Sequence, residues 1–290
     1  MTDRILHTPV LLREAVEALM PKAGGRYVDG TVGMGGHAEA LLQASSPSGE
    51  LLGVDVDAEA LERAGERLKP FGSRLRLCQG NYSRIDSMMD RAGWDQADGI
   101  LLDLGVSSVQ LLSPERGFSF QNEGPIDMRM DRSQGETVAD YLARVTPAEL
   151  ENRLTECGEG AQARRLARFL IGGISTWRTT SEMAAALEKT LPRRGGKHPA
   201  TRVFLALRMA VNRELDHLKD FLEKVGARLT PGGRLVIITF HSLEDRAVKW
   251  FGKENTGLTV IRPSFREPSE EEMRGNPMSR SAKMRVFEKT

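Results

Sequence analysis

The chain has 290 residues, of which 40% are hydrophobic and 28% charged, and its formal net charge is +1. This composition predicts a soluble globular protein with a large core, built as one big domain or as one domain with an insertion. It excludes a membrane span, because no apolar run approaches the roughly 20 residues that a bilayer requires, and the N-terminus lacks a signal-peptide hydrophobic region.

The cysteines and histidines exclude two further classes of protein. Cys78 and Cys157 are too few for a disulfide framework and lack the spacing of a zinc site. The five histidines show no paired spacing with one another or with cysteine, so we expect no metal ion. A reducing, cytoplasmic compartment is the default expectation.

The first part of the chain alternates between predicted strands and predicted helices. A first helix is expected to begin at Thr8, which can cap it, and Pro9, which suits its first turn. The order of these elements predicts an α/β fold with a parallel sheet. Predicted strands cover about residues 27–29, 51–55, 74–78 and 97–105, and predicted helices cover about residues 39–42, 58–68 and 85–92.

The pattern changes at residue 113. Residues 113–125 are polar and rich in turn formers, and residues 138–191 have helical spacing without strand-like alternation. We therefore predict a small all-helical domain over 113–205. It is inserted into a sheet domain formed by residues 1–112 and 206–290.

The sheet pattern resumes after the predicted insertion. One long helix, straight or kinked, is expected over about residues 200–229, and a tight turn at 230–233 follows it. Residues 234–240 are rich in β-branched side chains and predict a strand. Residues 283–288 are expected to form a final strand at the edge of the sheet.

A local excess of positive charge falls mainly in the insertion. Between residues 161 and 213 there are eleven basic residues and two acidic ones, a net charge of +9. Such a block is either a solvated face or a surface for a phosphate-bearing partner, and we give the two interpretations equal weight. The basic residues are Arg164, Arg165, Arg168, Arg178, Lys189, Arg193, Arg194, Lys197, Arg202, Arg208 and Arg213.

One stretch, residues 27–38, organises the predicted sheet. Its strand ends at Asp29 and is followed by a turn with four glycines and then by a helix. Because glycine has no Cβ, this arrangement lets the backbone come close to a nucleotide-like ligand. The next strand ends at Asp55, at about the distance along the chain where an acid meets a ribose diol. The alternative is a glycine-rich turn without a ligand.

Asp29 separates two classes of cofactor. Gly33, Gly35 and Ala38 fit the pattern of nicotinamide dinucleotide enzymes. However, a carboxylate at Asp29 would lie where a pyrophosphate binds and would repel it. S-adenosylmethionine (SAM) carries a sulfonium and an ammonium group, has no phosphate, and still presents a ribose diol to Asp55. These residues favour SAM over NAD.

Ligand-capable side chains follow each of the first four predicted strands: Asp29, Asp55, Tyr82 and Asp103. In an open parallel sheet, ligands bind outside the carboxyl ends of the strands. The sequence therefore predicts a binding site at this edge of the sheet.

Eight stretches, which span almost the whole chain in order, carry a resemblance to a known family. They are residues 7–12 (HTPVLL), 30–37 (GTVGMGGH), 101–108 (LLDLGVSS), 115–120 (ERGFSF), 124–131 (GPIDMRMD), 198–204 (HPATRVF), 240–246 (FHSLEDR) and 276–283 (NPMSRSAK). In these stretches the chain resembles the MraW/RsmH family, whose members methylate the exocyclic amine of a cytidine in bacterial small-subunit ribosomal RNA. Tyr82 and Val109 replace the phenylalanine and proline that are common in the family.

The resemblance implies a Rossmann-like SAM-dependent methyltransferase sheet whose helical insertion recognises the substrate. The implied reaction is methylation of the N4 amine of a cytidine in 16S ribosomal RNA, near the decoding centre. The implied partner is 16S rRNA within the small ribosomal subunit or a late precursor, and the choice between monomer and homodimer stays open. The implied lining of the SAM pocket is Gly35, Gly36, His37, Asp55, Tyr82, Asp103 and Gln110.

The catalytic residues are less well defined by the sequence. Because the exocyclic amine of cytidine is a weak nucleophile, an acceptor for its proton would help, and Asp103 and His241 are the candidates. The usual amino-methyltransferase signature is absent after Asp103. Methylation at carbon-5 would need a cysteine nucleophile, whereas Cys78 and Cys157 are both interpreted as structural.

Two hypotheses concern the RNA and two concern competing functions. Arg164, Arg165 and Arg168 are expected to hold phosphates, while Phe118 or Phe120 contacts a nucleotide that is splayed out of the RNA. The competing functions are a NAD-dependent oxidoreductase and a non-catalytic RNA-binding or assembly protein.

Overall fold

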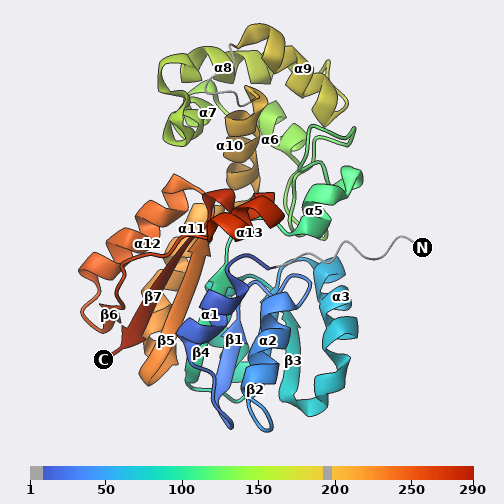
Figure 1. Ribbon diagram of the computed structural model, residues 1–290. Coiled ribbons are helices and arrows are strands. Elements are labelled where there is room, and N and C mark those ends of the chain that lie inside the picture. Colours follow the sequence, from blue (N-terminus) through green and yellow to red (C-terminus); the bar gives the residue numbers. More distant parts are fainter. Residues whose placement is uncertain (1–8, 192–197) are drawn as a thin grey trace. The chain divides into compact units, whose positions relative to one another are not determined.

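The computed structural model describes residues 9–191 and 198–290, which divide into two compact units (Figure 1). The first unit comprises the chain up to Gly105 and from Leu215 onward, and the second comprises Val106–Glu214. Among the described residues, no helix combines the length and the apolar character that crossing a bilayer requires.

The first unit is built on a seven-stranded sheet with the order β3-β2-β1-β4-β5-β7-β6. Strands β1 to β5 are parallel, whereas β7 runs antiparallel to both of its neighbours. The α/β fold class is thereby confirmed. The strands are β1 (Arg26–Asp29), β2 (Glu50–Asp55), β3 (Leu75–Gln79), β4 (Ala97–Asp103), β5 (Leu229–Thr239), β6 (Leu258–Val260) and β7 (Lys283–Lys289).

Helices cover both faces of this sheet (Figure 1). Successive strand residues point to opposite faces, so Tyr27 packs with α1, α2 and α3, whereas Val28 packs with α4, α11 and α12. This two-sided burial explains the continuous apolar run of β4. The helices of the unit are α1 (Leu12–Leu19), α2 (Gly36–Ala44), α3 (Ala58–Leu68), α4 (Ile85–Arg91), α11 (Glu214–Val225), α12 (Ser242–Glu254) and α13 (Glu270–Gly275).

The second unit contains helices and no strand within its described residues, 106–191 and 198–214. Thr137 and Thr146 begin two of the helices with reciprocal side-chain caps. Val106 and Leu111 pack on the core of this unit, so it begins before the predicted boundary at residue 113. Its helices are α5 (Ser108–Leu112), α6 (Val138–Arg144), α7 (Pro147–Leu154), α8 (Gly160–Gly173), α9 (Thr180–Thr190) and α10 (Ala200–Asn212).

The first helix begins later than the sequence predicts. Thr8 lies outside the described residues, and α1 begins at Leu12, after Leu11 in a left-handed conformation (φ 53°). The backbone N–H of Leu11 donates to Oε1 of Glu272 at 2.8 Å. A partner so far along the chain leaves no local signal in the sequence.

The long helix expected over residues 200–229 is two helices, α10 and α11. Arg213 adopts a left-handed conformation (φ 50°) and ends α10. Residues 230–233, expected as a tight turn, lie within β5, where the register with β4 shifts next to Ala97. This stretch is therefore an irregularity of a longer strand.

The expectation of a final edge strand is wrong. β7 lies between β5 and β6, and the three-residue strand Leu258–Val260 forms the edge instead. So short a strand carries too little alternation to be recognised from the sequence.

Candidate functional site

Three aspartates end three neighbouring parallel strands. β2, β1 and β4 are adjacent in the sheet and finish at Asp55, Asp29 and Asp103. Asp29 pairs in register with Gly53 on one side and with Leu101 on the other. Each neighbouring aspartate thus lies just beyond Asp29 along its own strand, and the carboxyl edge of the sheet gathers three carboxylates.

The glycine turn after β1 is tied to both neighbouring strands. Gly30 N–H donates to the carbonyl of Leu101 at 2.9 Å, and Val32 N–H donates to that of Val54 at 2.8 Å. A Cβ added to Gly30 would lie 2.4 Å from Cδ2 of Leu102. Only glycine lets the chain turn this closely over the strand ends.

Asp29 is a buried carboxyl with one unsatisfied oxygen. Its exposed fraction is 1%, and its Oδ1 accepts the backbone N–H of Thr31 at 3.2 Å. Its Oδ2 has no hydrogen-bond partner among the described residues. Burial raises the pKa of Asp29 to about 7, and the nearby Asp55 carboxylate adds to the rise. The site therefore disfavours a bare negative charge at Asp29 and would be stabilised by a cation there.

Asp55 organises the two turns on either side of it. Its Oδ2 accepts the N–H of Gly33 at 2.8 Å, and its Oδ1 accepts the N–H of Asp57 at 2.9 Å. Burial nevertheless raises the pKa of Asp55 to about 6. A carboxylate oxygen can accept more than one hydrogen bond, so both oxygens keep the capacity to accept a diol.

Asp103 and His37 form the third part of the site. The backbone N–H of Asp103 donates to Oγ1 of Thr31 at 2.6 Å, and its side-chain Oδ1 has no hydrogen-bond partner among the described residues. Its Oδ2 lies 3.7 Å from Nδ1 of His37. The other ring nitrogen of His37, Nε2, is 3.1 Å from the carbonyl oxygen of Val10. A carbonyl only accepts, so Nε2 carries the proton in this contact and Nδ1 is the atom that faces Asp103.

The pKa of the Asp103 carboxyl is also raised. Burial raises its pKa well above the ordinary value, and the neighbouring carboxylates of Asp29 and Glu244 raise it further. A carboxyl whose pKa is raised in this way is able to take up a proton near neutral pH.

Tyr82, Gly35 and Gly36 lie beside this edge of the sheet. Tyr82 begins the short turn η2 (Tyr82–Arg84) after β3, and its ring meets Phe221 edge-on at 5.7 Å. A Cβ added to Gly35 would lie 3.1 Å from Leu68, and one added to Gly36 would lie 2.3 Å from Cγ of Pro9. Protein packing alone therefore requires glycine at position 36, whatever else its backbone contacts.

Gln110 belongs to the second unit, whereas the other residues predicted to line the pocket belong to the first. It is 3% exposed, and its side-chain Oε1 accepts the N–H of Ser107 at 3.0 Å. Ser107 Oγ accepts the N–H of Gln110 in return, at 3.2 Å. This reciprocal pair caps the start of α5.

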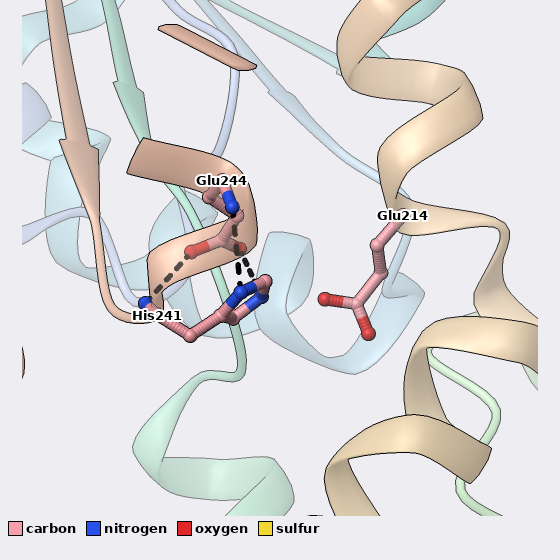
Figure 2. Close-up of side chains that lie close together, drawn as sticks. All are labelled: Glu214, His241 and Glu244. Carbon is pink, nitrogen blue, oxygen red and sulfur yellow. Dashed lines mark hydrogen bonds and ion pairs between the residues drawn. The ribbon is translucent and has the colours of Figure 1, made fainter. Parts of the chain in front are cut away.

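His241 caps the start of α12, and Figure 2 shows it beside Glu244. Nδ1 of His241 accepts the N–H of Glu244 at 3.4 Å, while Nε2 lies 3.1 Å from Oε1 of Glu244. The other oxygen of Glu244 accepts the N–H of Phe240 at 2.9 Å and that of His241 at 3.3 Å. Both ring nitrogens of His241 thus face groups of Glu244, which fixes the imidazole as a helix cap.

Comparison of the sequence with known proteins identifies the family to which the chain belongs. Residues 4–290 match the MraW methylase family. The chain belongs to this family. The resemblance drawn from the eight sequence stretches is thereby confirmed.

Relatives of this MraW methylase cover nearly its whole length. A protein from Dehalococcoides mccartyi named ribosomal RNA small subunit methyltransferase H is 45% identical over 302 residues, which cover 98% of this chain and 86% of the relative. A protein of the same name from Maridesulfovibrio salexigens is 42% identical over 310 residues, covering 98% and 96%. A crystal structure of an rRNA-methylase candidate from Clostridium thermocellum superposes with a TM-score of 0.50 at 12% identity, covering 96% and 97%, and supports the fold alone.

The cofactor of this MraW methylase is S-adenosylmethionine. The residues present fit a donor that carries positive charge. Asp29 and Asp103 each retain a buried carboxylate oxygen without a hydrogen-bond partner in the described part of the chain. A cationic group offsets the cost of ionising such carboxyls, whereas a phosphate would increase it.

Two residues of the site, Thr31 and Glu244, are not predicted from the sequence. Thr31 links the glycine turn to β4 through its hydroxyl, and Glu244 holds the start of α12. The spacing of His241 and Glu244 is that of a reciprocal helix cap, and this signal is sufficient to predict the role of Glu244.

Cys157, interpreted as structural, is a half-buried thiol whose burial raises its pKa to about 11, which makes it a poor nucleophile.

Proposed function

We propose that this methylase transfers a methyl group from SAM to the exocyclic N4 amine of a cytidine in 16S ribosomal RNA, near the decoding centre. The names of its relatives support ribosomal RNA of the small subunit as the substrate. The observation that carries the proposal is the trio of aspartates at adjacent strand ends, of which Asp29 is buried and Asp55 and Asp103 are half-buried. A ribosomal RNA substrate also favours the cytoplasm as the compartment in which the enzyme acts. The substrate would be the small subunit or a late precursor of it.

The chain's own residues would hold the donor as follows. Asp55 would accept the ribose hydroxyls, and Tyr82 would cover the adenine ring. Asp29 would lie beside the positive charge of the donor. Gly35, Gly36, His37, Asp103 and Gln110 would complete the lining of the pocket.

Asp103 is the stronger candidate for the proton acceptor. SAM would supply the methyl group and leave as an uncharged thioether when its S–CH3 bond breaks, and the attacking amine must lose one proton as the new C–N bond forms. Asp103 has a free oxygen and a raised pKa, and its second oxygen lies 3.7 Å from Nδ1 of His37. His241, the other candidate, caps α12 through Nδ1, and its Nε2 lies 3.1 Å from Oε1 of Glu244 without a hydrogen-bond partner among the described residues. We therefore assign to Asp103 the role of accepting the proton that the amine loses.

The helical unit would bind the RNA. Arg164, Arg165 and Arg168 are exposed on α8, and none of them has a carboxylate partner in the described part of the chain. Such arginines are suited to phosphates. Arg193, Arg194 and Lys197 of the same basic block lie outside the described residues.

The hypothesis that a phenylalanine contacts the target nucleotide loses support. Phe118 is 7% exposed in the core of the helical unit. Phe120 packs against His198 at 4.7 Å and Phe204 at 5.0 Å between ring centroids. Both rings are used in packing, so we do not assign either of them to the RNA.

The proposal is tested by incubating the protein with SAM and unmodified ribosomal RNA, either free or in small subunits that lack the modification. Mass spectrometry of the digested nucleosides then identifies the methylated atom. We expect N4-methylcytidine with at least one of the two substrates. Methylation at another atom, or none with either substrate, would contradict the proposal.

A further inference from the structure

Helix α12 is held firmly to the sheet by one of its faces. Val248 is fully buried, and the ring of Phe251 meets that of Phe287 edge-on at 5.5 Å. At Gly252 the helix approaches so closely that an added Cβ would lie 2.5 Å from Cε1 of Phe287. These contacts fix the rotation of the helix, so its opposite face is held outward.

The acidic residues of the first turn belong to the inner side. Glu244 is 2% exposed and accepts two backbone N–H groups. Asp245 accepts Nε of Arg285 at 2.8 Å. Neither carboxylate is available to neutralise cations on the outer face of the helix.

The outer face carries a stripe of three exposed cations. Arg246, Lys249 and Lys253 are spaced by three and four residues, which places them on one side of the helix. None of the three has a carboxylate partner among the residues that the structure describes. Glu254 is the one exposed acid of this helix, so the stripe keeps a net positive charge.

An exposed tryptophan interrupts this stripe. Trp250 is 53% exposed, whereas Trp94 of the same unit is 1% exposed. Nζ of Lys253 lies 4.9 Å from the centroid of the Trp250 ring. An aromatic ring among cations that lack a carboxylate partner is the combination with which proteins bind single-stranded nucleic acid, because bases stack on the ring while phosphates contact the cations.

We propose that the outer face of α12 is an RNA-binding surface, in which Arg246, Lys249 and Lys253 contact phosphates of the substrate RNA and Trp250 stacks on an unpaired base. This inference rests on the proposed function, because it assigns a second contact with the same substrate. The stripe from Arg246 to Lys253 is about 10 Å long at 1.5 Å per residue.

The location of the stripe suits a substrate contact. β5 ends at Thr239, next to β4 in the sheet, and α12 begins at Ser242. The helix therefore starts at the sheet edge where Asp103 lies. RNA bound along α12 would approach the site from within the first unit.

The test compares the full chain with a triple variant, R246A/K249A/K253A. Binding to an unmodified small-subunit rRNA transcript is measured by fluorescence anisotropy over a series of salt concentrations. A control variant, R63A/K69A/R91A, removes three exposed cations of the same unit that also lack a carboxylate partner among the described residues. We expect the triple variant to bind at least tenfold more weakly at low salt and to reduce the slope of log K against log salt by about 2 to 3. The control variant should reduce the RNA affinity and the salt slope much less.

Trp250→Ala tests the stacking contact separately. We expect a loss of roughly tenfold in affinity with an unchanged salt slope, and partial recovery in Trp250→Phe. Equal binding by the triple variant and the control would overturn the phosphate contact, and an unaffected Trp250→Ala would overturn the stacking. A failure of the proposed function would be visible separately, as an absence of methyl transfer by the unaltered chain.

Discussion

The backbone N–H of Gly33 donates to the Oδ2 of Asp55 at 2.8 Å. This bond joins the glycine turn after β1 to the carboxylate that ends β2. The acid that we assign to the ribose thus also sets the shape of the turn, so pocket and turn depend on one side chain.

Asp55→Asn should weaken SAM binding by roughly tenfold to a hundredfold. The variant keeps one oxygen but replaces the other with an amide group that cannot accept, and hydrogen bonds to a charged group contribute about 1.5–3 kcal/mol. Isothermal titration with SAM measures the loss. Asp95→Asn, at a highly exposed carboxylate of the same unit, is the control and should bind like the unaltered chain. Equal affinities for both variants would remove Asp55 from the pocket.

Asp29→Asn should stabilise the SAM-free protein at pH 8 and leave it nearly unchanged at pH 4.5. The pKa of Asp29 rises from its ordinary 3.8 to about 7 on folding. Its contribution to stability is therefore fully present below pH 3.8 and is lost as the pH rises to about 7. Asparagine stays neutral, so its advantage grows over that range.

Thermal unfolding of both proteins from pH 4.5 to pH 8 measures this advantage. We expect a rise in melting temperature of several degrees at pH 8. The same variant should bind SAM more weakly, because the carboxylate beside the positive charge is gone. A destabilised variant at pH 8 would show that Asp29 is not strained by its burial.

Asp103→Asn and His241→Asn separate the two candidate proton acceptors. Loss of a general base typically lowers the rate by 10²–10⁴-fold. We expect a loss of this size in kcat for Asp103→Asn. His241→Asn should retain most of its activity, because asparagine can cap α12 in place of the imidazole. Single-turnover methyl transfer at saturating SAM and RNA makes the comparison, and the opposite ranking would transfer the role to His241.

Charge reversal of Arg164, Arg165 and Arg168 to glutamate should weaken RNA binding and flatten its salt dependence. SAM binding should not change, since these residues lie on α8 of the helical unit. Arg165 also donates to the carbonyl of Thr190 at 3.0 Å, so thermal unfolding of the variant serves as the stability control. Unchanged RNA binding by a folded variant would exclude this face from the RNA surface.

The parallel half of the sheet was predictable because its signals are local. Helix α3 runs from Ala58 to Leu68, as expected from its apolar spacing and from the Pro70 beyond it. The strands that end at Asp29, Asp55 and Asp103 were recognised from apolar runs that finish in a carboxylate. Their common edge then follows from the geometry of a parallel sheet.

The features that were missed depend on distant partners or on unusual backbone. Leu11 and Arg213 adopt left-handed conformations without being glycine, and the Leu11 N–H is satisfied by Glu272. Thr31 and Glu244 act through hydrogen bonds to backbone groups that only the fold brings near. The residue types alone could not show these contacts.

Methyl-labelled SAM and unmodified small-subunit ribosomal RNA together identify the atom that this methylase modifies. We expect the digested nucleosides to carry the label in N4-methylcytidine, and we expect Asp103→Asn to lose most of this label even at saturating SAM. Label on carbon-5 of cytidine, on a ribose, or on no nucleoside at all would contradict the proposed reaction.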